Sequence, residues 1–163
     1  MKRAQSDEAC IQIRIAAPDD AARITSVLHE SFIEYKSSYT DEAFSATVPA
    51  PDQIRKRMAE GPVWMALQGD TIVGTVAAVE RGGELYIRGM AVSPAARGLG
   101  IGELLLKHME SFAESHGVKR LTLSTTPFLD RAIRLYERFG FRRSEEGPHD
   151  LFGTPLFTMV KSL

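Results

Sequence analysis

The sequence lacks several features that mark particular classes of protein. Its 163 residues include a single cysteine, Cys10, which excludes an internal disulfide and any metal site made of cysteines alone. No apolar run approaches the roughly 20 residues that cross a bilayer. Residues 1–8 are polar where a signal peptide needs an apolar segment. We therefore expect a cytoplasmic protein that makes no contact with a membrane.

An excess of charge of one sign is also lacking. The 20 lysines and arginines balance 21 aspartates and glutamates, which gives a formal net charge of −1. Nucleic-acid-binding domains usually carry a basic surface, so this balance argues against a nucleic-acid partner. The four histidines show no spacing typical of a metal site, and we expect no metal.

What is present is the composition of an ordinary globular protein. Hydrophobic residues make up 44% of the chain and charged residues 25%. A length of 163 residues suffices for one domain with a sizeable core and is short for two. We expect a flexible N-terminal extension over residues 1–9 and a single domain over residues 10–163.

The first part of the chain changes from a strand pattern to helix patterns. Residues 11–15 alternate apolar and polar side chains, as a half-buried strand does. Helices are predicted over residues 18–35 and 51–61, each beginning with proline and an acidic residue. The basic run at residues 55–57 is interpreted as a solvated face. Between the two helices the periodicity fades over residues 36–50, which predicts a short helix or a mobile loop.

The second part predicts a meander followed by a parallel βαβ unit. Short runs rich in apolar residues predict strands at residues 63–67, 72–79, 84–92, 120–123 and 156–160. Amphipathic patterns predict helices over residues 101–116 and 129–139, each followed by a glycine. Short glycine turns join the first three strands and make them antiparallel. A helix separates the third strand from the fourth, so this pair is expected to be parallel.

A glycine-rich stretch over residues 90–102 leads from the third strand of the meander into the next helix. Gly98, Gly100 and Gly102 remove side chains that would keep an anion from the backbone, and the new helix presents unpaired N–H groups. The stretch therefore predicts a phosphate-binding loop, although a glycine turn without a ligand is the alternative. A dinucleotide fingerprint does not fit, because its third glycine falls on Glu103, and no P-loop lysine follows.

Two motifs resemble the GCN5-related N-acetyltransferases (GNAT). Arg97-x-x-Gly100-x-Gly102 resembles the pyrophosphate-binding signature of that family, and Ala-x-x-Leu-Tyr-Glu-x-x-Gly-Phe at residues 132–141 resembles the segment that follows it. Two motifs in this order and at this distance are hard to obtain by chance. The resemblance implies an α/β (mixed α+β) fold with a central mixed, mostly antiparallel sheet and helices on both faces. It also implies that acyl-CoA binds where two parallel strands splay apart.

The resemblance further implies which residues would bind acetyl-CoA, the acyl donor. Backbone groups of Met90, Ala91 and Val92 would pair with the pantetheine arm as an added strand does. Leu129 stands where many members carry an asparagine that contacts the cofactor, so this side chain supplies no such hydrogen bond. Backbone amides would hold the pyrophosphate at Arg97, Gly98, Leu99, Gly100, Ile101 and Gly102.

Two side chains are candidates for catalysis. Tyr136 matches the tyrosine that many members use as a general acid toward the departing sulfur, although the helical pattern alone makes it a packing residue. Glu84 is the candidate general base, because an acidic residue on this strand is a base in some relatives. Alternation puts it on one strand face with Tyr86, Arg88 and Met90. An exposed glutamate beside a turn also needs no function.

These observations predict an N-acetyltransferase that moves acetyl directly from acetyl-CoA to a primary amine of a small molecule or peptide. The alternative is an acyl-CoA-binding or regulatory module without turnover, and a dinucleotide-binding domain comes third. We expect the acceptor to lie between residues 36–50 and the strand that starts at Glu84, with Tyr35, Tyr39 and Phe44 as apolar walls. The sequence leaves the identity of the acceptor open, and likewise the choice between a monomer and a homodimer.

Overall fold

A computed structural model describes residues 10–163, so the extension predicted for residues 1–9 lies outside the described residues. The helices are α2 (Ala21–Phe32), α3 (Asp41–Thr47), α4 (Pro51–Glu60), α5 (Ile101–Ser115) and α6 (Asp130–Phe139), with short 3-10 turns at Pro18–Asp20, Ile33–Ser38 and Pro94–Ala96. The strands are β1 (Ile11–Ile15), β2 (Val63–Gln68), β3 (Thr71–Arg81), β4 (Glu84–Val92), β5 (Arg120–Thr125), β6 (Arg142–Arg143), β7 (His149–Leu151) and β8 (Thr154–Ser162).

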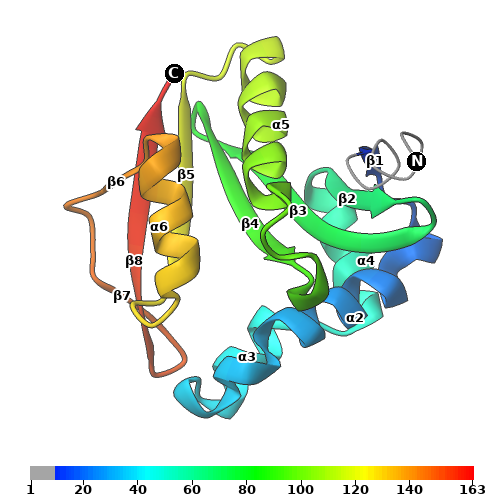
Figure 1. The fold of residues 1–163 in the computed structure, drawn as a ribbon. Helices are drawn as coiled ribbons and strands as arrows, with labels where there is room; N and C mark the ends of the chain where they lie inside the picture. The colour runs from blue at the N-terminus through cyan, green and yellow to red at the C-terminus, as the bar shows by residue number, and fades with distance from the viewer. Residues whose placement is uncertain (1–9) are drawn as a thin grey trace.

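One mixed sheet runs through the described chain in the order β1-β2-β3-β4-β5-β8-β6, with β7 paired to β8 (Figure 1). Strands β2, β3 and β4 form the predicted antiparallel meander, and β1 pairs antiparallel with β2 at its edge. Strands β4 and β5 are parallel and are joined through α5, which confirms the predicted βαβ unit. The remaining neighbours in the sheet are antiparallel. The mostly antiparallel mixed sheet expected from the sequence is therefore confirmed.

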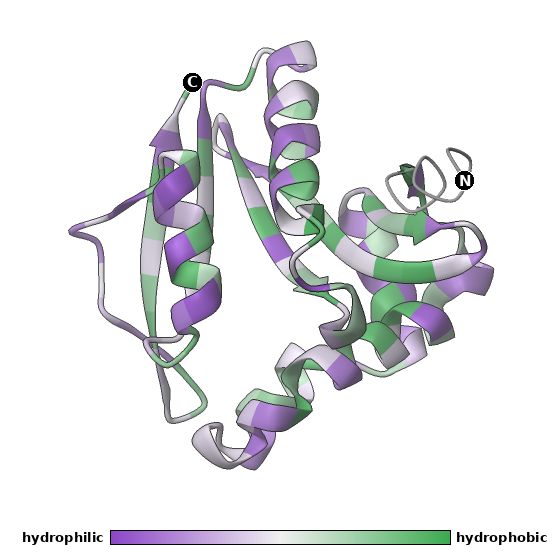
Figure 2. Ribbon diagram, in the orientation of Figure 1, coloured by the Kyte–Doolittle hydropathy of each residue, from purple (hydrophilic) through white to green (hydrophobic). Residues whose placement is uncertain are grey.

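Helices cover both faces of this sheet (Figure 1). On one face, α2 and α4 pack on the meander around Ile24, Leu28 and Ile54, each at most 2% exposed. On the other face, α5 packs through Leu105, Leu106 and similar side chains, and α6 lies beside it. The apolar sides of the helices turn toward the strands and their charged sides turn outward, as the hydropathy colours show (Figure 2). The core thus consists of two layers of side chains, one on each face.

The segment over residues 36–50 is folded, which settles the choice left open by its sequence. Thr40 caps α3, because its Oγ1 accepts a hydrogen bond from the Ala43 N–H at 3.2 Å. The same Oγ1 donates to the Phe152 carbonyl at 2.7 Å, in the turn between β7 and β8. Tyr39 packs edge-on against Phe128 with ring centroids 4.9 Å apart. Contacts with distant parts of the chain therefore hold this segment beside the C-terminal strands.

Some elements differ from the sequence predictions. Strand β8 is longer than predicted, and the short strands β6 and β7, which pair with it, were not predicted. The predicted first helix begins as a 3-10 turn at Pro18–Asp20 and returns to 3-10 geometry at Ile33–Ser38. Within residues 10–163, no helix is both long enough and apolar enough to cross a membrane.

Candidate active site

The candidate site begins where β4 and β5 separate. These parallel strands pair only from Leu85–Leu121 to Ile87–Leu123. Beyond that point β4 bulges, since Arg88 pairs with Ala77 of β3 but Ala91 pairs with Thr75. Gly89 sits in this bulge with a φ of +57°, a conformation that favours glycine. Next to this bulge, β4 lines a cleft of about 390 Å³ together with α2, α5 and α6.

The bulge overturns one expectation about strand faces. Met90 packs with the core on the α5 side of the sheet, whereas Ala91 packs with the core on the α2 side. Arg88 lies opposite Ala77 on the α2 side, so it does not share a face with Met90. The extra residue in the bulge shifts the alternation by one position, which simple counting along the strand cannot reveal.

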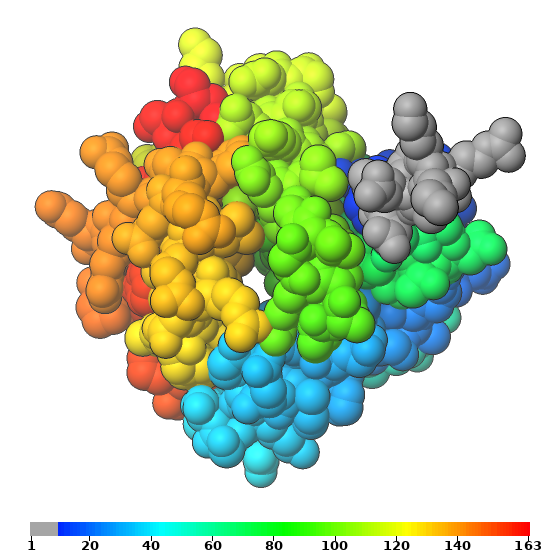
Figure 3. Space-filling view, in the orientation of Figure 1, coloured from blue at the N-terminus to red at the C-terminus, as the bar shows by residue number. Residues whose placement is uncertain are grey.

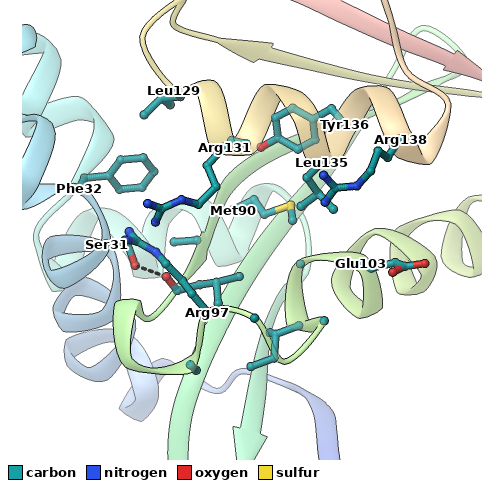
Figure 4. Close-up of a pocket in the computed structure, with 18 of the residues that line it drawn as sticks. Ser31, Phe32, Met90, Arg97, Glu103, Leu129, Arg131, Leu135, Tyr136 and Arg138 are labelled. Carbon is teal, nitrogen blue, oxygen red and sulfur yellow. Dashed lines mark hydrogen bonds between the residues drawn. The ribbon is translucent and has the colours of Figure 1, made fainter.

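The end of β4 offers a backbone donor to the cleft. Ser93 N–H donates to the Val73 carbonyl of β3 at 2.8 Å, so the backbone groups of the preceding residue, Val92, point away from β3. Its carbonyl accepts a hydrogen bond from Ser31 Oγ at 3.0 Å (Figure 4). Val92 lines the cleft, and its N–H lies on the same edge of β4 as this carbonyl. Ala91 also lines the cleft, but its backbone groups face β3 by the same alternation.

The loop before α5 forms the end of the cleft that suits an anion. Gly98 and Gly100 have φ values of +87° and +76°, and the space where a Cβ would stand is open at both. The first backbone hydrogen bond across the start of α5 runs from the Leu104 N–H to the Gly100 carbonyl at 3.1 Å. The amides of Ile101, Gly102 and Glu103 therefore have no partner within the helix. Free N–H groups and the positive end of a 15-residue helix make this loop suitable for phosphate.

Gly102 has a packing role that its place in the motif does not reveal. A Cβ on Gly102 would lie 2.6 Å from Cδ2 of Leu135 on α6. The helical glycine thus lets α5 and α6 approach closely at the cleft. Leu99 differs from its neighbours, because its side chain is 50% exposed and does not line the cleft.

Three arginines lie around the cleft, and only Arg97 was selected from the sequence. Arg97 forms an ion pair with Glu34 at the end of the cleft near α2. Arg131 and Arg138, both on α6, also line the cleft (Figure 4). Their spacing with Leu135, at i, i+4 and i+7, is the signal for one shared helix face. This positive rim adds to the suitability of the cleft for a phosphorylated ligand.

Tyr136 extends from α6 into the cleft and is 8% exposed (Figure 4). Its ring packs against Phe141 with centroids 5.9 Å apart. Burial raises the pKa of Tyr136 to about 12, and the nearby Tyr39 contributes in the same direction. The phenol therefore stays protonated at neutral pH and can donate a hydrogen bond or a proton. The helical pattern did not mark Tyr136 as a functional residue. The match to the family motif did.

A second cavity of about 310 Å³ adjoins the cleft. Four residues line both spaces, namely Phe32, Met90, Leu129 and Tyr136. The space-filling view shows the molecule hollowed between the green α5 and the yellow to orange α6 (Figure 3). A donor in the cleft and an acceptor in the second cavity would thus meet at Met90 and Tyr136.

The predicted acceptor walls lie in different places. Tyr39 lines the second cavity, together with Ala46 and Thr47 of α3. Tyr35 lines the cleft instead. Phe44 lines neither space; it is 7% exposed and packs against Tyr39 and Ala43. The segment over residues 36–50 therefore borders the second cavity through Tyr39, Ala46 and Thr47, whereas the start of β4 at Glu84 does not line it.

Glu84 lies away from both cavities. It stands at the first position of β4, before the pairing with β5 begins, and forms an ion pair with Arg120 at 3.2 Å. Met90 lies six residues further along the strand, about 20 Å away at ~3.3 Å per residue. This placement argues against Glu84 as the general base. Among residues 10–163, no cluster of three or more histidine, cysteine or acidic side chains could hold a metal ion.

Comparisons with known proteins agree with this geometry. The sequence profile described as the acetyltransferase (GNAT) family matches residues 23–141. An uncharacterized N-acetyltransferase of Schizosaccharomyces pombe is 35% identical over 82 residues, which cover 49% of this chain and 50% of that protein. The chain thus spans about half the length of this curated relative.

Solved structures show the same fold at low sequence identity. The PaiA N-acetyltransferase of Thermoplasma acidophilum, solved in complex with coenzyme A, has a TM-score of 0.79 at 18% identity and covers 94% of this chain and 99% of its own. A GNAT acetyltransferase of Elizabethkingia anophelis with acetyl-CoA bound has a TM-score of 0.66 at 20% identity, covering 94% and 98%. Since the family profile covers most of the sequence and both motifs lie at the cleft, the chain belongs to the acetyltransferase (GNAT) family.

Proposed function

We propose that the protein is an acetyl-CoA-dependent N-acetyltransferase, with acetyl-CoA in the cleft and a primary amine of a small molecule or peptide in the second cavity. The observation that carries this proposal is the meeting of the two spaces at Met90 and Tyr136. A module that only binds acyl-CoA would need the cleft but not a second cavity that opens onto the same tyrosine.

The residues around the cleft fit the parts of acetyl-CoA. The amides of residues 98–103 and the positive end of α5 would hold the pyrophosphate, and Arg131 and Arg138 would pair with phosphate groups at the rim. The Val92 N–H would bond the pantetheine arm between the splayed strands. Acetyl-CoA is here a substrate that supplies an activated acetyl group.

The reaction needs little from the protein beyond placement and one donor. A neutral amine attacks the thioester carbonyl carbon and forms a carbon–nitrogen bond, then the carbon–sulfur bond breaks and its electron pair leaves on sulfur. The nitrogen gives up one proton, which balances the thiolate charge so that the products are the amide and the coenzyme A thiol. A hydrogen bond from the Tyr136 hydroxyl would stabilise that charge. Glu84 takes no part in this step, because it is ion-paired with Arg120 at the first position of β4 and lines neither cavity.

The phosphate-binding part of the proposal can be tested with a matched pair of variants. Gly100 and Gly117 both have positive φ, at +76° and +69°, and both have open space around a Cβ. Alanine at either position should therefore cause similar backbone strain, about 1–2 kcal/mol. Only Gly100 lines the cleft, whereas Gly117 follows the other end of α5.

Titration calorimetry with coenzyme A is the measurement. We expect Gly100→Ala to weaken binding at least tenfold and Gly117→Ala to leave it unchanged, with a similar loss of thermal stability in both. Equal coenzyme A affinity in the two variants would remove the loop from the binding site. Turnover is tested separately, by following free thiol while acetyl-CoA is mixed with a panel of amines; binding without thiol release would favour the silent module.

A further inference from the structure

The second cavity has an unusual balance of charge. Among the described residues that line it, two are charged, Arg57 and Arg88, and both are cationic. No aspartate, glutamate or histidine lines it. A cavity that takes a protonated amine would be expected to carry the opposite charge. The positive lining therefore indicates that the occupant brings an anionic group of its own.

Arg57 carries most of this argument. The sequence predicts a solvated side chain, but Arg57 is half-buried, and its Nη2 donates to the Ala46 carbonyl at 3.1 Å. Its Nη1 lies 3.2 Å from the place that a Cβ on Gly89 would occupy, beside the bulge of β4. No carboxylate among the described residues forms an ion pair with it. Burial and then the charge of Arg88 lower the pKa of Arg57, whereas Glu60 and Tyr86 act in the opposite direction to a smaller extent.

Arg88 is only partly satisfied. Its Nη2 pairs with Glu60 at 2.9 Å, and that carboxylate is 53% exposed and does not line the cavity. The Nε of Arg88 is buried without a hydrogen-bond partner, and so is the Oγ1 of Thr126 in the same lining. The guanidinium groups of Arg57 and Arg88 thus have one carboxylate nearby, that of Glu60 outside the cavity. One of the two positive charges is therefore left without an ion-pair partner among the described residues. A buried donor without a partner in the protein calls for an explanation, and a bound ligand group is one.

We infer that the acceptor amine carries a carboxylate, which Arg57 binds with help from Arg88 while the amine end reaches Met90 and Tyr136. This rests on the proposed function and specifies its substrate class. A planar guanidinium matches a carboxylate through two parallel hydrogen bonds. The volume of about 310 Å³ suits a compound of amino-acid size. Nearby cations also disfavour the protonated amine, and so favour the neutral form that attacks.

The first test needs no variant. Amino acids with the amine at increasing distance from the carboxylate, from glycine to 6-aminohexanoate, are each compared with their own carboxamide. Rates of thiol release at saturating acetyl-CoA give KM and kcat. A charged hydrogen bond of about 1.5–3 kcal/mol corresponds to a KM for the best acid about 10- to 150-fold below that of its amide. Equal KM values for acids and amides, with turnover of both, would overturn this inference and leave the acetyltransferase proposal intact.

The second test uses neighbouring arginines on α4. Arg57→Gln should raise the KM of the acids at least tenfold and leave the KM of the amides and the affinity for coenzyme A unchanged. Arg57→Lys should keep part of the preference. Arg55→Gln is the control, because Arg55 is exposed and bonds Asp52 and the Pro18 carbonyl outside the cavity. A preference for acids that survives in Arg57→Gln would assign the carboxylate to another group and contradict the inference.

A third measurement serves if Arg57→Gln does not fold, since the variant also loses the bond to Ala46. Butanoate should inhibit the wild-type enzyme competitively against the amine and not against acetyl-CoA, whereas butanamide should not inhibit. Equal inhibition by both compounds, or none by either, would contradict a carboxylate site.

Discussion

Replacing Tyr136 with phenylalanine removes one hydroxyl at the junction of the two cavities. The hydroxyl makes no hydrogen bond to another described residue, so folding does not depend on it. With a pKa of about 12, the phenol is a weaker acid than a thiol of pKa about 8.5. Complete proton transfer from this phenol to the sulfur is unfavourable. We therefore expect Tyr136 to act mainly by donating a hydrogen bond while charge develops.

The loss of one such donor typically lowers kcat by about 10²- to 10³-fold. We expect Tyr136→Phe to show a loss of this size in single-turnover thiol release, with coenzyme A affinity unchanged. Phe141→Leu is the packing control, since Phe141 contacts the Tyr136 ring but lines neither cavity. It should destabilise the protein without a comparable loss of kcat. Wild-type kcat in Tyr136→Phe, when chemistry limits turnover, would show that the hydroxyl takes no part.

Three further predictions follow from placement and burial. Because the folded-state pKa of Tyr136 lies above the ordinary value of 10, the stability that its neutral form contributes is complete below about pH 10 and is lost as the pH rises toward about 12. Chemical denaturation of the Tyr136→Phe protein at increasing pH should therefore lack this part of the alkaline loss of stability. Gly102→Ala should destabilise the protein by about 1–3 kcal/mol in thermal unfolding, because its Cβ would collide with Leu135, and Leu135→Ala in the same chain should restore part of the loss. Glu84→Gln should keep wild-type kcat and lose less than about 1 kcal/mol of stability, since its pair with Arg120 is partly exposed; a large loss of kcat would return Glu84 to the mechanism.

The order of elements and the glycine loop could be predicted from the sequence because both depend on local patterns. Periodicity places β1, the meander, α5 and α6 close to their observed bounds. The αL glycines at positions 98 and 100 stand at the strand-to-helix junction, as expected. Segments with regular patterns and strong turn signals therefore reveal their structure before any contact between distant residues is known.

Features that depend on tertiary contacts could not be predicted in this way. The bulge at Gly89 moves Met90 to the other face of the sheet, and nothing in the alternation of β4 signals an extra residue. Arg57 belongs to a basic run that is solvated at Arg55, but the approach of α3 covers Arg57 alone. The second cavity is lined by residues from eight helices and strands, from α2 to β8, so its charge became visible only in the fold.

A crystal structure with acetyl-CoA bound would test the central claim most directly. The account predicts the pyrophosphate within hydrogen-bond distance of backbone amides at residues 98–103, and the pantetheine arm beside Val92. It also predicts the sulfur within reach of the Tyr136 hydroxyl, facing the cavity that contains Arg57. Acetyl-CoA bound outside the splay of β4 and β5, or with its thioester turned away from Tyr136, would contradict the account.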